Sequence, residues 1–215
     1  EGMPDDTEVV YAVGSPAGVV EGDDVDHVFR TAPAPGVVRP VRIWALGDSG
    51  TASTDAEDVR DAYAVYAPNP LDTDVWLMLG DNAYGSGTES EYDTAVFDFY
   101  PEWLRQVPLW PALGNHDGYT AFSDTQTGPY FELFSNPTAG ESGGVPSGTE
   151  AYFSFDYANI HFVCLDSSDS DRSTTGAMAT WVTADLEASA DAAWTIVFFH
   201  HPPYSHGSHN RSEER

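Results

Sequence analysis

The stretch LGDNAY at residues 79–84 follows an apolar run, and three further segments of the chain have the same form. They are LGDSG at 46–50, LGNHD at 113–117 and FHHPPY at 199–204. Each contains side chains that can bind metal ions directly after its apolar run. Asp48 and Asp81 are 33 residues apart and Asp81 and Asn115 are 34 apart, close to the roughly 30 residues of a β-α-β unit. This spacing predicts that the side chains leave the same edge of one sheet.

The residue types are those of a two-metal hydrolytic centre. Two metal ions about 3.5–4 Å apart can hold a phosphate ester and generate hydroxide near neutral pH, and one carboxylate can bridge both ions. Asp81, in the middle of the order, is the expected bridge, and Asp48 would bind the first ion. Asn115 and His200 offer a neutral oxygen and an imidazole nitrogen to a second, divalent ion. We therefore expect two unlike metal sites.

These motifs resemble those of the purple acid phosphatases, a subgroup of the calcineurin-like metallophosphoesterases, and in particular the secreted bacterial ones. The resemblance runs over nearly all 215 residues and rests on GDSG, GDNAY, GNHD and HHPPYSHGSH in that order. The wider superfamily usually has Asp-x-His in the first segment. This chain has Gly50 there and places Tyr84 three residues after Asp81, which is typical of the purple subgroup.

The resemblance implies two sets of metal ligands. Asp48, Asp81 and Tyr84 match the ligands of a ferric site. A phenol with a reference pKa of about 10 ionises near neutral pH only on a strongly Lewis-acidic ion, which favours Fe(III) at Tyr84. Asp81, Asn115 and His200 match the ligands of a second site for Zn, Mn or Fe(II).

The resemblance also implies histidines that act on the substrate. His116 matches the outer histidine that contacts substrate and protonates the leaving group. His209 stands nine residues after His200, where relatives have another substrate-facing histidine, so we expect it to act as an acid or an outer contact. His201 and His206 match nothing specific in the family.

One family motif is missing from the chain. Relatives end the site with Gly-His-x-His, which gives each metal a further histidine, whereas this sequence stops at Arg215 without it. We expect the 215 residues to be a fragment of a longer enzyme. The alternative is that His206 and His209 replace the missing pair.

The implied function is hydrolysis of phosphate monoesters, of the acid phosphatase type, by a metal-bound hydroxide at a dinuclear centre. The expected partner is a small phosphorylated substrate. One alternative keeps the site but uses it as a phosphodiesterase or nucleotidase. Another is a catalytically silent, secreted metal-binding domain, which the incomplete ligand set motivates.

The fold class is α/β. Residues 41–215 are expected to form the catalytic domain, and the resemblance implies an αββα sandwich of two facing sheets with helices outside. Residues 1–40 resemble the last strands of a fibronectin-like β-sandwich followed by a Pro-rich linker. The patterns predict strands at 41–46, 75–79, 109–113, 151–157, 160–165 and 194–199, and helices at 54–67, 89–106 and 178–190.

Charge and composition exclude several partners. The chain has 35 acidic residues, eight arginines and no lysine, for a formal charge of −27, which disfavours nucleic acid and anionic membranes. No apolar run approaches the roughly 18 residues of a membrane helix. A secreted, periplasmic or extracellular location is inferred from the resemblance alone, and the sequence does not indicate an oligomeric state.

Two further polar residues lie in or after an apolar stretch at 160–165. His161 is expected to be a packed core histidine rather than a metal ligand. Asp166, directly after the stretch, is expected to cap backbone N–H groups or to orient a loop of the site.

Overall fold

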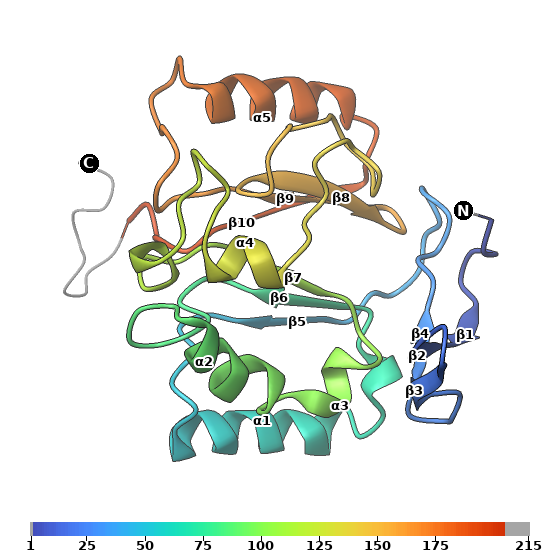
Figure 1. Cartoon of the computed structure of the whole chain (residues 1–215). Coiled ribbons are helices and arrows are strands. Elements are labelled where there is room, and N and C mark those ends of the chain that lie inside the picture. The colour runs from blue at the N-terminus through green and yellow to red at the C-terminus, as the bar shows by residue number, and fades with distance from the viewer. Residues whose placement is uncertain (1, 205–215) are drawn as a thin grey trace.

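Two three-stranded sheets face each other in the computed structural model, which describes residues 2–204 (Figure 1). The first sheet is parallel and consists of β5 (Ile43–Leu46), β6 (Val75–Met78) and β7 (Leu109–Pro111) in that order. The second has the order β10 (Trp194–Phe198), β9 (Ile160–Cys164), β8 (Phe153–Tyr157). In it β10 runs parallel to β9, and β8 forms an antiparallel hairpin with β9. The predicted α/β sandwich is confirmed.

The central strand β6 is buried on both faces. Val75 and Leu77 pack in the apolar layer between the sheets, whereas Trp76 and Met78 pack in the layer beneath the helices. All four are at most 2% exposed. Alternate side chains of a strand point to opposite faces, so this one strand links the two cores.

Helix α1 (Thr54–Tyr66) covers the outer face of the first sheet, and α5 (Ala177–Ala188) covers that of the second (Figure 1). The sequence suggests Thr54 as the N-cap of α1, which is wrong by one residue. Ser53 has the extended backbone of an N-cap, and its side chain accepts a hydrogen bond from the backbone N–H of Ala56. No helix within residues 2–204 is long and apolar enough to cross a membrane.

Two segments differ from their predicted secondary structure. The helix predicted over 89–106 consists of α2 (Glu89–Tyr92), a π-helical turn over Asp93–Phe97 and α3 (Pro101–Leu104). The Gly/Ser/Pro-rich composition of residues 120–149 predicts a long loop, but this stretch contains the short helix α4 (Pro129–Leu133).

The N-terminal segment forms four short strands, whereas its sequence pattern predicts two, at residues 8–13 and 26–31. One two-stranded sheet pairs β1 (Glu8–Val10) with β4 (Val28–Arg30), and another pairs β2 (Ala12–Ser15) with β3 (Gly18–Gly22). Arg39 links this segment to the sheets, since its guanidinium binds Asp6 at 2.8 Å and Asp74 at 3.0 Å. The fibronectin-like origin of the segment and a domain boundary at residue 40 stay predictions.

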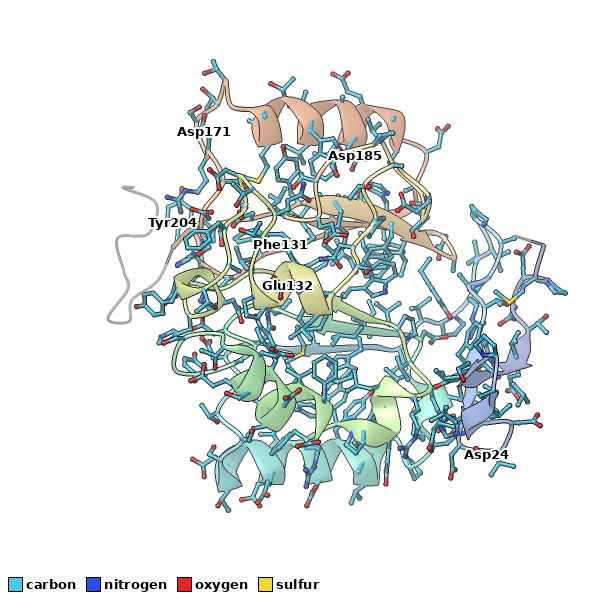
Figure 2. The ribbon with its side chains drawn as sticks, in the orientation of Figure 1. Asp24, Phe131, Glu132, Asp171, Asp185 and Tyr204 are labelled. Atoms are coloured by element: carbon cyan, nitrogen blue, oxygen red, sulfur yellow. The ribbon has the colours of Figure 1, made fainter. Side chains whose placement is uncertain are left out.

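His161 is a packed core histidine, as predicted, and it contacts two carboxylates, of which Asp185 lies on α5 (Figure 2). Its Nδ1 is 2.7 Å from Asp156 and its Nε2 is 2.8 Å from Asp185, so both ring nitrogens donate to carboxylate oxygens. Burial lowers the pKa of His161, but the hydrogen bonds to Asp185 and Asp156 outweigh it and the net pKa is raised. The imidazolium therefore ties β9 to α5.

The His161 cluster predicts a pH-dependent contribution to stability. Because the folded-state pKa of His161 is raised, its contribution is complete below the unfolded value of about 6.5 and is lost as pH rises through the folded value. His161→Gln should lower the free energy of unfolding at pH 6 by about 1–3 kcal/mol, the penalty for weakening buried charged hydrogen bonds. The free energy of unfolding of this variant should also decrease less steeply with pH above pH 6 than that of the wild type. Denaturant titrations of both proteins from pH 5 to 9 would check this, and equal pH slopes would contradict it.

Candidate metal centre

The carboxyl ends of the parallel strands converge on one edge of the first sheet. Leu46 pairs with Met78, and Met78 pairs with Pro111, so the segments that follow β5, β6 and β7 emerge together. Asp48 and Asp81, two residues beyond Leu46 and three beyond Met78, both have left-handed backbones with φ of 54° and 53°. Aspartate tolerates this conformation better than most residues, and such strain often accompanies functional sites.

The structure brings together all five residues that the sequence predicts as metal ligands. Atoms of Asp48, Asp81 and His200 lie within 4.8 Å of one another. The Tyr84 hydroxyl is 2.9 Å from Asp48 Oδ1 and 2.8 Å from Asp81 Oδ2. His200 Nε2 is 3.1 Å from Asn115 Oδ1 and 3.4 Å from Asp81 Oδ1. Four of these residues come from the first sheet and His200 comes from the end of the second.

The orientation of His200 fits a metal ligand. Its Nδ1 is 3.0 Å from the carbonyl oxygen of Leu79, which can only accept, so Nδ1 carries a proton. In the neutral ring, Nε2 then presents a lone pair toward oxygens of Asn115 and Asp81. These atoms would serve as ligands of a cation, and a backbone carbonyl on the other nitrogen is the usual support of a metal-binding histidine.

Tyr84 fits a strongly Lewis-acidic ion. Burial, together with the hydrogen bonds to Asp81 and Asp48, raises the pKa of its phenol well above the usual value. Two carboxylates share the single phenolic proton. A cation held by the same carboxylates would favour the ionised form of Tyr84.

Gly50 accounts for the departure from the Asp-x-His pattern. Its N–H donates to the Asp81 carbonyl at 3.1 Å, and its own carbonyl accepts from the Tyr84 N–H at 3.0 Å. A Cβ on Gly50 would lie 2.3 Å from the carbonyl carbon of Asn82. No side chain fits on this backbone at position 50, and Tyr84 reaches the carboxylates instead.

Glu91 holds the loop that follows Tyr84, a role that the sequence analysis missed. Its carboxylate accepts from the backbone N–H groups of Thr88 (2.9 Å), Ser86 (3.1 Å) and Gly85 (2.7 Å). These hydrogen bonds, that of Thr88 foremost, lower the pKa of Glu91 to about 2. The available signal was the pattern Thr88-x-x-Glu91, a capping box.

His116 lies against both the metal-binding residues and an aromatic surface. Its backbone N–H donates to Asp81 Oδ1 at 2.8 Å, and its ring packs 4.5 Å from that of Tyr84 and 5.4 Å from that of Tyr119. Its Nδ1 is 2.6 Å from the carbonyl oxygen of Gly85, so Nδ1 donates and Nε2 is left for a ligand.

The remaining histidines of the last motif are only partly described. His201 does not join the metal-binding atoms but exchanges hydrogen bonds with Ser167, whose Oγ is 2.9 Å from the His201 backbone nitrogen and 3.1 Å from Nδ1. His206 and His209 lie outside the described residues, so the acid role of His209 stays a prediction.

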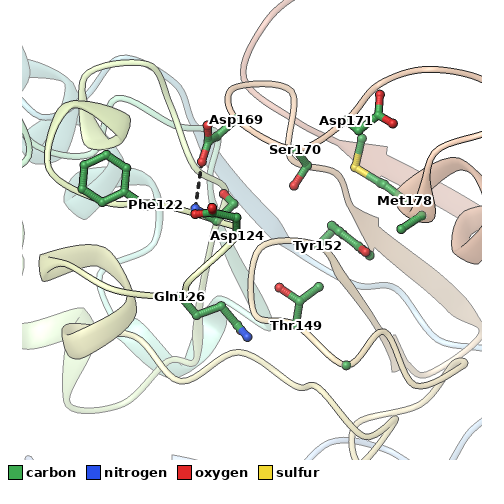
Figure 3. A pocket seen from close by; sticks show the side chains of 12 residues that line it. Phe122, Asp124, Gln126, Thr149, Tyr152, Asp169, Ser170, Asp171 and Met178 are labelled. Carbon is green, nitrogen blue, oxygen red and sulfur yellow. Dashed lines mark hydrogen bonds between the residues drawn. The ribbon is translucent and has the colours of Figure 1, made fainter.

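An open cavity of about 610 Å³ lies beside a loop that also contacts the metal-binding segments (Figure 3). Asp166 holds this loop through the N–H groups of Ser168, Asp169 and Ser170, so it both caps the loop and orients it. Ser168 Oγ donates to the Gly114 carbonyl at 3.3 Å. The cavity is lined in part by Phe122, Asp124, Tyr152, Asp169, Asp171 and Met178.

Comparison with known families gives one match over most of the chain. The model of the calcineurin-like phosphoesterase family matches residues 41–215. Purple acid phosphatase 23 of Arabidopsis thaliana is 27% identical over 241 aligned residues, covering 100% of this chain and 50% of the relative. Purple acid phosphatase 15 of the same plant is 28% identical over 216, covering 87% and 38%. The chain thus spans half or less of the length of these relatives.

The fold is similar to that of a solved plant protein. The purple acid phosphatase PPD1 isolated from yellow lupin (Lupinus luteus) seeds superimposes with a TM-score of 0.59 at 19% identity. The match covers 85% of this chain and 34% of the lupin chain. At this identity the likeness concerns the fold alone.

Gly80 offers a test of the placement of His200. A Cβ on Gly80 would lie 2.7 Å from three atoms of the His200 side chain, so Gly80→Ala should displace that imidazole. Gly36→Ala is a matched control, because its φ of +84° is close to the +88° of Gly80 and its Cβ would meet nothing within 4 Å. Both variants carry the left-handed strain of about 1–2 kcal/mol. Only Gly80→Ala should lose metal, counted by mass spectrometry after dialysis, and equal metal contents would contradict the assignment.

Proposed function

This chain belongs to the calcineurin-like phosphoesterase family, and we propose that the protein hydrolyses phosphate monoesters at a dinuclear metal centre of the purple acid phosphatase type. The observation that carries the proposal is that four predicted ligands meet at one place although they come from two different sheets. They are Asp48, Asp81 and Tyr84 of the first sheet and His200 of the second. The similarity to plant purple acid phosphatases supports it further.

The two ions would have different sets of ligands that share Asp81 in this proposal. Asp48, Tyr84 and Asp81 would hold Fe(III), because a phenol between two carboxylates suits a strong Lewis acid. Asp81, Asn115 and His200 would hold Zn, Mn or Fe(II), which accept mixed oxygen and imidazole ligands. When bound, the two ions would polarise the phosphoryl oxygens and supply an activated hydroxide near neutral pH.

His116 would supply the proton for the leaving group. The Gly85 carbonyl keeps Nδ1 as a donor, so a protonated ring presents its second proton on Nε2. Tilted and edge-on contacts with the Tyr84 and Tyr119 rings restrict the imidazole, which orients that proton. A leaving oxygen within hydrogen-bond reach of Nε2 would accept it as the ester bond breaks.

The charges around the site favour small monoesters over nucleotides. The cavity beside the metal-binding segments carries Asp124, Asp169 and Asp171, and no arginine among residues 2–204 lines it. A substrate with further phosphates would bring negative charge to these carboxylates, whereas a neutral leaving group would not. Phosphodiester or nucleotide hydrolysis at the same centre is the alternative, and a catalytically silent metal-binding domain is the other.

The metal content and colour of the full-length protein test the ferric assignment. We expect a broad visible absorption band together with about one iron and one other metal per chain. Tyr84→Phe should abolish the band, because the phenolate is the source of the charge transfer, and Tyr119→Phe should keep it. A colourless wild-type protein with two manganese or two zinc ions would overturn the ferric site.

Asn115 tests whether the second metal site carries the reaction. Asn115→Ala removes one ligand and should lower kcat/KM for 4-nitrophenyl phosphate at least about 100-fold, since even outer partners of metal ligands contribute 10–100-fold. Asn159→Ala, in the turn between β8 and β9, is the control. Wild-type protein should prefer the monoester to bis(4-nitrophenyl) phosphate. Unchanged hydrolysis in Asn115→Ala would refute the two-metal reaction.

A further inference from the structure

Asp117 is a buried carboxylate to which neither the motifs nor the family resemblance assign a role. It is the last residue of GNHD, and its side chain is fully buried at 0% exposure. Burying a carboxylate is costly unless hydrogen-bond donors surround it. The donors around Asp117 therefore indicate what the charge is used for.

The donors to Asp117 come from two metal-binding loops. Its Oδ2 accepts from the backbone N–H of Gly114 at 2.8 Å. The backbone N–H of Asn82 lies 3.2 Å from both oxygens, and the Asn82 side-chain amide donates to Oδ2 at 3.1 Å. Asn82 directly follows Asp81, and Gly114 directly precedes Asn115. The carboxylate is thus one residue away from a ligand on each side.

A buried phenol completes the arrangement. Tyr92, at 0% exposure in α2, donates its hydroxyl to Asp117 Oδ1 at 2.6 Å. The Asn82 amide also donates to the Ala112 carbonyl at 2.9 Å, which ties it to the end of β7. Hydrogen bonds to a charged acceptor are about twice as strong as neutral ones, so Asp117 fixes both loops against α2 and β7.

We propose that Asp117 is a positioning residue that sets the separation of Asp81 and Asn115, and through it the affinity of the second metal site. Asp117 itself does not touch an ion. The inference rests on the dinuclear centre proposed above, in which Asp81 and Asn115 bind the same divalent ion. Asp48 and Tyr84 are not tied to Asp117, so the first site depends on it only through Asp81.

The test measures metal affinity rather than activity, by competition with a chelator in the full-length protein. Asp117→Ala removes every acceptor, and Asp117→Asn keeps the shape but loses the charge. We expect Asp117→Ala to weaken binding of Zn or Mn at the second site by about 10–100-fold, as for other outer partners of metal ligands. Binding of iron at the first site should weaken less, and Asp117→Asn, whose amide turns one acceptor oxygen into a donor, should show the same selective loss. Asp58→Ala and Asp58→Asn, at an exposed position on α1, are matched controls and should bind both ions as the wild type does.

A further variant keeps the test valid if Asp117→Ala does not fold. Tyr92→Phe removes only the 2.6 Å hydrogen bond to Asp117 and leaves the buried ring in place. It should weaken the second site in the same selective way, by a smaller factor.

Selective loss at the second site supports the inference. Wild-type affinity at both sites in the Asp117 variants overturns it, and so does an equal loss at both sites, which indicates general destabilisation. A wild-type protein that binds no metal would instead refute the dinuclear centre itself.

Discussion

The burial of β6 is the constraint on which the rest of the structure depends. Its four residues alternate between the layer beneath the helices and the layer between the sheets, so the strand can neither shift in register nor rotate. Asp81 follows three residues later and is itself only 3% exposed. Its carboxylate is contacted by the Tyr84 hydroxyl of its own loop, the His116 backbone N–H and the His200 ring, so two further segments are arranged around one buried group.

The chain as a whole and the candidate centre in particular carry negative charge, which bound cations would have to neutralise in the proposed reaction. The chain carries a formal charge of −27, and Asp48 and Asp81 share one phenolic proton at the candidate centre. A phosphate dianion would be repelled by such a surface over long distances. In the proposed enzyme, bound cations reverse the sign of the potential locally, so substrate attraction is confined to the centre and weakens steeply away from it.

Much of the fold follows from local pattern. The apolar runs predicted the six strands of the two sheets within two residues at each end, and the recurrence of Asp48, Asp81 and Asn115 placed them at one edge. What the sequence could not predict depends on contacts between distant residues. The ion pairs of His161 join strand to helix, and the contacts of Asp117 join two loops with α2, so neither role has a signature within a short window.

The departures at element ends have similarly physical causes. Ser53 and Thr54 are both competent N-caps, and only the backbone conformation at Ser53 decides between them. The π-helical turn over Asp93–Phe97 inserts into a segment whose composition favours ordinary helix.

The position of His200 at the end of the second sheet has a wider consequence. Because the other four predicted ligands all come from the first sheet, an ion bound by them and by His200 would link the two sheets of the sandwich. A free ion concentration one hundred times the dissociation constant would add about 2.7 kcal/mol to the free energy of unfolding, so metal supply would govern the stability of the folded protein as well as its chemistry.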